Sequence, residues 1–297
     1  MAELSPMMQQ YLEIKNQHKD EILFYRIGDF YEMFFDDAVT ASRELDLTLT
    51  GKQCGLAERA PMCGVPFHSY EGYVARLIAK GYKVAICEQV EDPAKAKGLV
   101  KRDIIRVVTP GTVIESSMLQ DDRNNYIASI FLKGKKAGLC FADVSTGEFH
   151  ITSLNTAPLQ RQIMNELYTY MPREIIVNND AFDMSLLDNY TKRVDAHLEV
   201  VSAEKFDYET AIKLINDNLS SAQISELNVS ENEIAVCALG AVILYLKDTQ
   251  KKDEIEAPSE LELYDCEKYM KLDMSARRNL ELTRSMMTGD KRHSLLW

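Results

Sequence analysis

The spacing of apolar residues alternates between helix-like and strand-like along the first 115 residues. After the capping residue Ser5 and a proline, apolar residues recur at helical spacing and predict a helix over 6–17. Residues 22–27 predict a short buried strand that ends at Gly28. The sequence then predicts a helix over 29–45, because its first four residues resemble a capping box.

A turn-rich stretch separates this helix from the next one. Residues 51–61 predict a loop, and a second helix follows over 70–79, with serine before it and glycine just past its end. Strands are predicted at 82–90 and 103–109. Since strands and helices alternate, the pattern predicts one α/β domain over residues 1–115.

Three strand-like segments open the second half, after a linker at 112–124. They lie at 126–132, 137–144 and 147–153 and predict a three-stranded meander. The pattern then alternates, with a helix at 157–170, a strand at 174–177, a short helix, a strand at 197–201 and helices at 203–217 and 231–249. This is the order of an RNase-H-like α/β domain, predicted over 125–250.

The last stretch, 262–297, follows a polar connector and predicts a partial α-helical segment. Its helix is expected over 273–287, capped by Asp273 or Ser275. The apolar end at Trp297 lacks a finishing turn, which we interpret as truncation, with a natural short tail as the alternative.

The charge of the chain limits how it binds nucleic acid. The formal net charge is −12, and residues 1–118 hold 14 Lys and Arg against 17 Asp and Glu, which leaves −9 for the rest. Phosphate neutralisation needs Lys and Arg. A DNA contact is therefore expected in the N-terminal part, through a local basic patch, while the acidic second part suits contact with proteins.

Composition argues against several other classes of protein. The apolar runs are shorter than the ~20 residues that span a bilayer, and no export signal is visible, so no membrane contact is predicted. Six cysteines without C-x-x-C spacing indicate a reduced cytoplasmic protein, and five scattered histidines indicate no metal site. No G-x-x-x-x-G-K-[ST] loop is present, so we expect no ATP hydrolysis by this chain.

Phe30-Tyr31-Glu32 is the stretch most informative about function. On composition alone, Phe30 is a core residue near a helix start and Glu32 is a capping partner. Alternatively, both project toward a ligand, because a phenylalanine can wedge into a base step from the minor groove, at least cost where the pair is mismatched. A carboxylate beside the wedge repels phosphates but can hydrogen-bond the edge of a displaced base.

Several long motifs resemble the MutS family of mismatch-repair proteins. The run Phe24–Phe34 is similar to the family's F-x-E mismatch-reading motif, and further motifs follow in family order over essentially the whole chain. They are Pro61–His68, Val84–Gln89, Arg106–Thr112, Asp143–Phe149 and Leu272–Glu281. The resemblance implies a mismatch-recognition domain at 1–115, an RNase-H-like connector domain at 125–250 and the truncated start of a helical core at 262–297.

The resemblance also implies roles for single residues. Phe30 would stack on the mispaired base from the minor groove, and Glu32 would hydrogen-bond that base. Five residues of a loop are expected beside the DNA, unless the loop only shapes the domain: Met62, Gly64, Pro66, Phe67 and His68. Arg102 would contact a phosphate or sugar, unless it lies on a solvated face.

For the whole protein, the resemblance implies binding of duplex DNA with mismatches or small loops, as the first step of repair. Full-length members of the family are expected to form homodimers and to bind ATP and Mg²⁺ in a later domain. Their connector domain is similar to a docking site for downstream repair proteins. The expected location is the bacterial cytoplasm, at the nucleoid.

A nuclease is the rival interpretation from the enzyme class. Asp143 follows a strand where RNase-H-like nucleases place a metal-binding carboxylate. The sequence does not assign Glu148, Asp180 or Asp183 as its partners, and the family uses this fold without catalysis. We therefore predict no enzyme activity for this chain. A pure interaction scaffold, resting on the acidic second domain, is the third interpretation.

Overall fold

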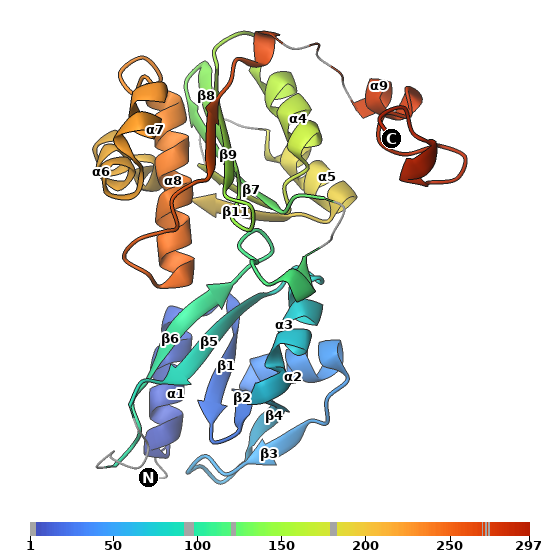
Figure 1. Ribbon diagram of the computed structural model, residues 1–297. Coiled ribbons are helices and arrows are strands. Elements are labelled where there is room, and N and C mark those ends of the chain that lie inside the picture. Colours follow the sequence, from blue (N-terminus) through green and yellow to red (C-terminus); the bar gives the residue numbers. More distant parts are fainter. Residues whose placement is uncertain are drawn as a thin grey trace. The chain divides into compact units, whose positions relative to one another are not determined.

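A computed structural model of the protein describes residues 4–91, 98–119, 123–178, 183–268, 270, 272 and 274–297 (Figure 1). The chain forms two compact units, Met1–Asn125 with Tyr245–Ile255 and Tyr126–Leu244 with Glu256–Trp297. Each unit contains its own six-stranded mixed sheet with helices packed on it. The α/β fold class predicted from the sequence is confirmed.

The sheet of the first unit has the strand order β3-β4-β2-β1-β5-β6. Its neighbours pair antiparallel, except that β1 and β5 run parallel. The elements are α1 (Pro6–Gln17), β1 (Glu21–Ile27), β2 (Phe30–Phe34), α2 (Phe35–Leu45), β3 (Thr50–Lys52), β4 (Ala60–Pro66), α3 (Tyr70–Ile78), β5 (Lys83–Gln89) and β6 (Arg102–Val108).

Two apolar layers cover this sheet. On one face α1 packs through Tyr11, whose ring lies edge-on against those of Tyr25 and Phe34. On the other face α2 and α3 cover a cluster that includes Phe24 and Met33 (Figure 1). Because successive residues of a strand point to opposite faces, β1 and β2 each contribute side chains to both layers.

The helix predicted over 29–45 is partly wrong, because residues 30–34 form strand β2 and the helix α2 begins only at Phe35. Gly28, with φ +56°, starts a two-residue turn between β1 and β2, so Asp29 lies in a hairpin and caps no helix. Phe30 is exposed while Tyr31 and Met33 are buried. This period of two suits a strand and not a helix.

The loop predicted over 51–61 also contains strand residues. β3 includes Gly51 and pairs with the first residues of β4, and β4 in turn pairs with β2. Glycine and proline are typical of turns, and they concealed these two strands in the sequence. With β2, the N-terminal sheet therefore has three more strands than the apolar pattern predicts.

The sheet of the second unit has the order β11-β10-β7-β8-β9-β12. β7, β8 and β9 form an antiparallel meander, and β10 and β11 run parallel to β7, which is the predicted RNase-H-like arrangement. The elements are β7 (Tyr126–Lys133), β8 (Lys136–Asp143), β9 (Glu148–Leu154), α4 (Leu159–Tyr170), β10 (Glu174–Asn178), α5 (Met184–Val194), β11 (His197–Val201), α6 (Tyr208–Asn218), α7 (Ser221–Glu226), α8 (Glu233–Gln250) and β12 (Glu260–Leu263).

Helices cover both faces of this second sheet (Figure 1). α4 and α5 pack on one face through a cluster that includes Ile163, Leu167 and Tyr190. On the other face α8 approaches the sheet closely, because the Ser129 hydroxyl donates a hydrogen bond to the carbonyl of Ala238 at 2.6 Å. The buried meander therefore forms the centre of a three-layer unit.

Two features of the C-terminal part differ from the expectation. Residues 251–262, which were predicted as a polar connector, contain most of β12, and this strand pairs parallel with β9 and extends the sheet. The helix predicted over 273–287 is a single short helix, α9 (Met274–Asn279), and Glu281 with φ +49° lies just beyond its end. Asp273, one of the two proposed caps, lies outside the described residues. Among the helices of the described residues, none is long and apolar enough to cross a membrane.

Candidate nucleic-acid interface

Phe30 lies at the tip of the β1–β2 hairpin. It pairs with Ile27 across the turn and with Pro66 on β4, and the amide of Phe67 donates a hydrogen bond to the carbonyl of Asp29 at 2.9 Å. The backbone on both sides of Phe30 is thus fixed, yet its side chain is 47% exposed. Phe30 is therefore an ordered surface aromatic, and the alternative that it is a core residue is excluded.

Glu32 lies on the same face of β2 as Phe30, two residues further along the strand. Its carboxylate Oε2 is 2.5 Å from Nζ of Lys52, at the end of β3. The side chains of Glu32 and Lys52 are 14% and 29% exposed, so the ion pair is mostly shielded from water. A base edge that displaced Lys52 would meet a carboxylate already held at the sheet surface.

Gly64 faces Glu32 directly across the β2–β4 pair. A Cβ atom on Gly64 would lie 3.2 Å from the carbonyl oxygen of Tyr31 and 3.5 Å from Cγ of Glu32. The absence of a side chain at this position lets the Glu32 side chain lie against the backbone of β4. A glycine at position 64 is thus needed for the position that the Glu32 side chain takes beside Phe30.

A polar network supports the hairpin tip from the opposite face of β2. The Glu88 carboxylate accepts hydrogen bonds from the Tyr31 hydroxyl and, at 3.0 Å, from Nη1 of Arg26. The Arg26 guanidinium also lies 3.7 Å from the ring centre of Phe67, as a cation–π contact. Burial and the hydrogen bond to Glu88 raise the pKa of Tyr31, so its hydroxyl stays a donor. Sequence reasoning missed this network, because its members come from four separate segments.

Residues 62–66 were predicted as part of a loop, which is wrong, because they belong to strand β4. Met62 is half-buried against the α1 layer, and Pro66 ends the strand beside Phe30. Phe67 and His68 form a short 3-10 turn after β4, and both are exposed. Of the five expected DNA-side residues, Pro66 and Phe67 contact the hairpin tip through their backbones, while Met62 lies farthest from it along β4.

Arg102 is largely buried, at 9% exposure, which does not fit the solvated face given as its alternative. Its guanidinium donates hydrogen bonds to the carbonyls of Arg26 at 2.7 Å and Val100 at 3.0 Å, and to Oε1 of Gln10 at 3.1 Å. It also lies 4.9 Å from the ring centre of Tyr25. These contacts give Arg102 a role in joining α1, β1 and β6. They do not support the expected phosphate contact, which stays a prediction.

The described acidic residues that were considered as metal ligands of a nuclease form hydrogen bonds within the fold. Asp143 is buried, and its carboxylate accepts hydrogen bonds from the amide and hydroxyl of Ser145 in the β8–β9 turn. Asp183 caps α5, Glu148 accepts a hydrogen bond from the Tyr126 hydroxyl, and Asp180 lies outside the described residues. Nothing in this geometry favours the nuclease interpretation.

One group of potential metal ligands occurs among the described residues, and Asp143 is not part of it. Glu174, His197 and Glu199 place a ligand atom each within 4.8 Å of one another, because β10 and β11 pair in parallel register. Each of the three already has an interaction partner in the fold. The spacing of the histidines along the sequence did not predict this group.

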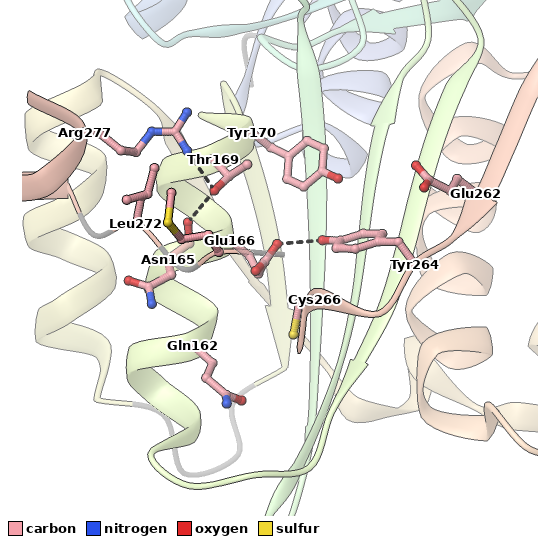
Figure 2. Close-up of a pocket in the computed structure, with 11 residues that line it drawn as sticks. Gln162, Asn165, Glu166, Thr169, Tyr170, Glu262, Tyr264, Cys266, Leu272 and Arg277 are labelled. Carbon is pink, nitrogen blue, oxygen red and sulfur yellow. Dashed lines mark hydrogen bonds between the residues drawn. The ribbon is translucent and has the colours of Figure 1, made fainter. Parts of the chain in front are cut away.

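A separate hollow of about 330 Å³ lies in the second unit, beside one face of α4 (Figure 2). The Tyr264 hydroxyl donates a hydrogen bond to the Glu166 carboxylate at 2.7 Å, and Nη1 of Arg277 donates one to the Thr169 hydroxyl at 3.2 Å. Burial and the charge of Glu166 raise the pKa of Tyr264. Four of the polar side chains that line the hollow thus bond to one another in pairs, and the sequence analysis did not predict the hollow.

Comparison with known proteins identifies both units. The family model "MutS domain I" matches residues 5–117, and "MutS domain II" matches residues 125–259. The chain belongs to the MutS family. It is 49% identical over 298 residues to the DNA mismatch repair protein MutS of Ruminiclostridium cellulolyticum, which covers 100% of this chain and 34% of that relative.

Other MutS relatives give the same picture. The proteins of the same name from Acetivibrio thermocellus and Lachnoclostridium phytofermentans are 49% and 45% identical over 298 residues. Each alignment covers 100% of this chain and 34% or 32% of the relative. The chain thus spans about a third of the length of the curated MutS relatives it matches.

Proposed function

We propose that this chain recognises mismatched or looped-out bases in duplex DNA, with Phe30 as the wedge and Glu32 as the reader of the displaced base. The observation that carries the proposal is the exposure of Phe30 on a rigid hairpin tip, with a carboxylate two residues away on the same face. A wedge has to be ordered before it meets DNA, because ordering it on binding costs affinity.

Selectivity follows from the cost of opening the base stack. Inserting an aromatic ring into a step unstacks it, and the cost is lowest where the pair is already mismatched. Stacking by Phe30 therefore contributes to the binding of mismatched DNA, whereas on paired DNA the cost of unstacking largely offsets it. The net charge of −12 argues against binding by bulk electrostatics, so contacts of this kind carry more of the discrimination.

Glu32 adds a polar contact with the base to the apolar stacking contact of Phe30. Its carboxylate accepts hydrogen bonds, and a base displaced from its pair offers donor groups that pairing otherwise occupies. On paired DNA the carboxylate gains no hydrogen bond from a displaced base. Glu32 therefore favours mismatched DNA, because only there does it bind a displaced base.

The test is a pair of binding titrations on the purified chain at one fixed low salt concentration. One duplex carries a single mismatch and the other is fully paired, with otherwise identical sequence. We expect tighter binding to the mismatched duplex. In Glu32→Ala, binding to paired DNA should stay level or strengthen, and the ratio of the two affinities should fall. Equal affinity of the unmodified chain for both duplexes would overturn the proposal.

The remaining expectations concern the wider protein. The acidic second unit is proposed as a connector that docks downstream repair proteins, and homodimerisation is proposed for the full-length protein. A DNA substrate implies a location at the nucleoid in the bacterial cytoplasm. We assign no ATP or Mg²⁺ site to these residues, and the use of both by full-length family members stays an expectation.

A further inference from the structure

Lys52 reaches across β4 to Glu32. β3 and β2 lie on opposite sides of β4, with Lys52 opposite Ala60 and Glu32 opposite Gly64. The Lys52 ammonium nevertheless lies 2.5 Å from the Glu32 carboxylate and 5.7 Å from the ring centre of Phe34. The long lysine side chain thus crosses strand β4, which includes Ala60 and Gly64. It ends beside Glu32, the residue proposed to read the base.

The surroundings hold this ion pair in one arrangement. The Glu32 side chain is only 14% exposed and lies against the backbone at Gly64, which has no Cβ to push it away. Lys52 is the basic partner that the described contacts assign to Glu32. A charge-assisted hydrogen bond between two largely shielded groups is stronger than a surface ion pair.

The ion pair addresses the difficulty of placing a carboxylate beside DNA. An isolated negative charge at the wedge would be repelled by the phosphates of every duplex, matched or mismatched. With Lys52 bound, the pair is neutral and directs the carboxylate along the sheet surface. Exchange of this ammonium for a donor of a displaced base would release Lys52 toward the backbone phosphates.

We propose that Lys52 is a positioning residue that neutralises Glu32 in the free protein and is exchanged for the displaced base on mismatched DNA. This inference rests on the proposed function of Glu32. On paired DNA no donor replaces Lys52, so the ion pair stays closed. Lys52 therefore acts on mismatch selectivity through Glu32 and not by a phosphate contact of its own in every complex.

A double-mutant cycle tests the inference, with affinities for mismatched and paired duplexes at one fixed salt concentration. Lys52→Met keeps the length of the side chain and removes its charge. The paired complex then holds an uncompensated carboxylate, whereas the mismatched complex no longer has to break an ion pair, so we expect the mismatch-to-paired ratio to rise about fivefold to tenfold. In the Glu32→Gln background, Lys52→Met should change the ratio by less than about twofold. Lys52→Arg should retain most of the ratio.

Lys80→Met is the matched control, because Lys80 is also an ion-paired lysine of the first unit, bound to Glu44 at 2.9 Å. It should leave the ratio unchanged. If Lys52→Met lowers affinity equally with and without the Glu32 carboxylate, Lys52 is an independent phosphate contact and the inference is wrong. If the unmodified chain does not discriminate at all, the proposed function fails first, and the inference fails with it.

Discussion

The Tyr31 hydroxyl donates a hydrogen bond to the Glu88 carboxylate on one face of β2, while Phe30, one residue earlier, is exposed on the other face. The two aromatic residues are neighbours in sequence and opposite in environment. Anchoring Tyr31 in the core fixes the direction in which Phe30 points, because adjacent residues of a strand alternate between faces. The hairpin tip therefore presents its aromatic side chain without help from a ligand.

This relationship predicts unequal losses of stability for two alanine substitutions. Tyr31→Ala removes a buried ring and its hydrogen bond to Glu88, and should cost about 3–5 kcal/mol of unfolding free energy. Phe30→Ala removes a half-exposed ring and should cost less than about 1 kcal/mol. Urea unfolding of both variants measures the difference. A larger loss for Phe30→Ala than for Tyr31→Ala would contradict the assigned faces.

Arg102→Met is expected to act on stability. It removes the three hydrogen bonds that the guanidinium donates to the carbonyls of Arg26 and Val100 and to the Gln10 amide, which should cost about 2–4 kcal/mol. Thermal or urea unfolding checks this. If the variant is as stable as the parent while the salt dependence of DNA binding flattens by about one phosphate contact, Arg102 faces DNA after all.

Two glycines should respond oppositely to an added methyl group. A Cβ on Gly138 in β8 would lie 1.9 Å from the carbonyl oxygen of Ile234 in α8, so Gly138→Ala should destabilise the second unit by about 1–3 kcal/mol. Gly72 in α3 is exposed, with nothing within 4 Å of such a Cβ, so Gly72→Ala should stabilise by about 0.5–1 kcal/mol. Unfolding curves of both variants test the predicted signs.

Buried thiols predict a loss of stability at alkaline pH. Burial raises the pKa of Cys63 and Cys237 to about 11 and of Cys87 to about 12. In the unfolded chain thiols ionise near ~8.5, so the folded state binds more protons between these values. The stability that the neutral thiols contribute is full below about pH 8.5 and falls as pH rises toward 11.

Two measurements check the thiol prediction. Unfolding free energy should decrease between neutral pH and pH ~9.5, in the window set by the thiols. At neutral pH, iodoacetamide should label these three cysteines only after the chain is unfolded, since thiolate is the reactive form. Rapid labelling of the folded chain would show that these thiols are accessible and not shielded as described.

The apolar pattern predicted β1 and the meander of β7, β8 and β9, but it missed β2 in the middle of the first sheet and β3 and β4 at its edge. The strands around 22–27 and 126–154 carry continuous apolar runs, because both of their faces are covered, and such runs are visible in the sequence. β2 was assigned to a helix because Asp29 and Glu32 have the spacing of a capping box. These residues form a strand because of the hairpin at Gly28 and because β2 pairs with a strand on each side. Neither is a local property of the sequence.

The candidate site shows the same limit. Phe30 and Glu32 were singled out from the sequence because a family motif contains them. Lys52 was not, because it is 20 residues away and meets Glu32 only through the pairing of three strands. Arg102 was assigned a phosphate or sugar contact from the family resemblance, with a solvated face as the alternative. Two of its three acceptors, Arg26 and Gln10, come from separate segments, and spacing along the chain does not reveal them.

The most direct test of the account is the effect of Phe30→Ala on discrimination between mismatched and paired DNA. Base–aromatic stacking is worth ~1–3 kcal/mol, so we predict that the ratio of affinities falls about 5- to 150-fold, chiefly through weaker binding to the mismatched duplex. Ile105→Ala is the control, because Ile105 in β6 is equally exposed at 47% and should leave the ratio unchanged. A folded Phe30→Ala variant that discriminates as well as the parent would contradict the wedge.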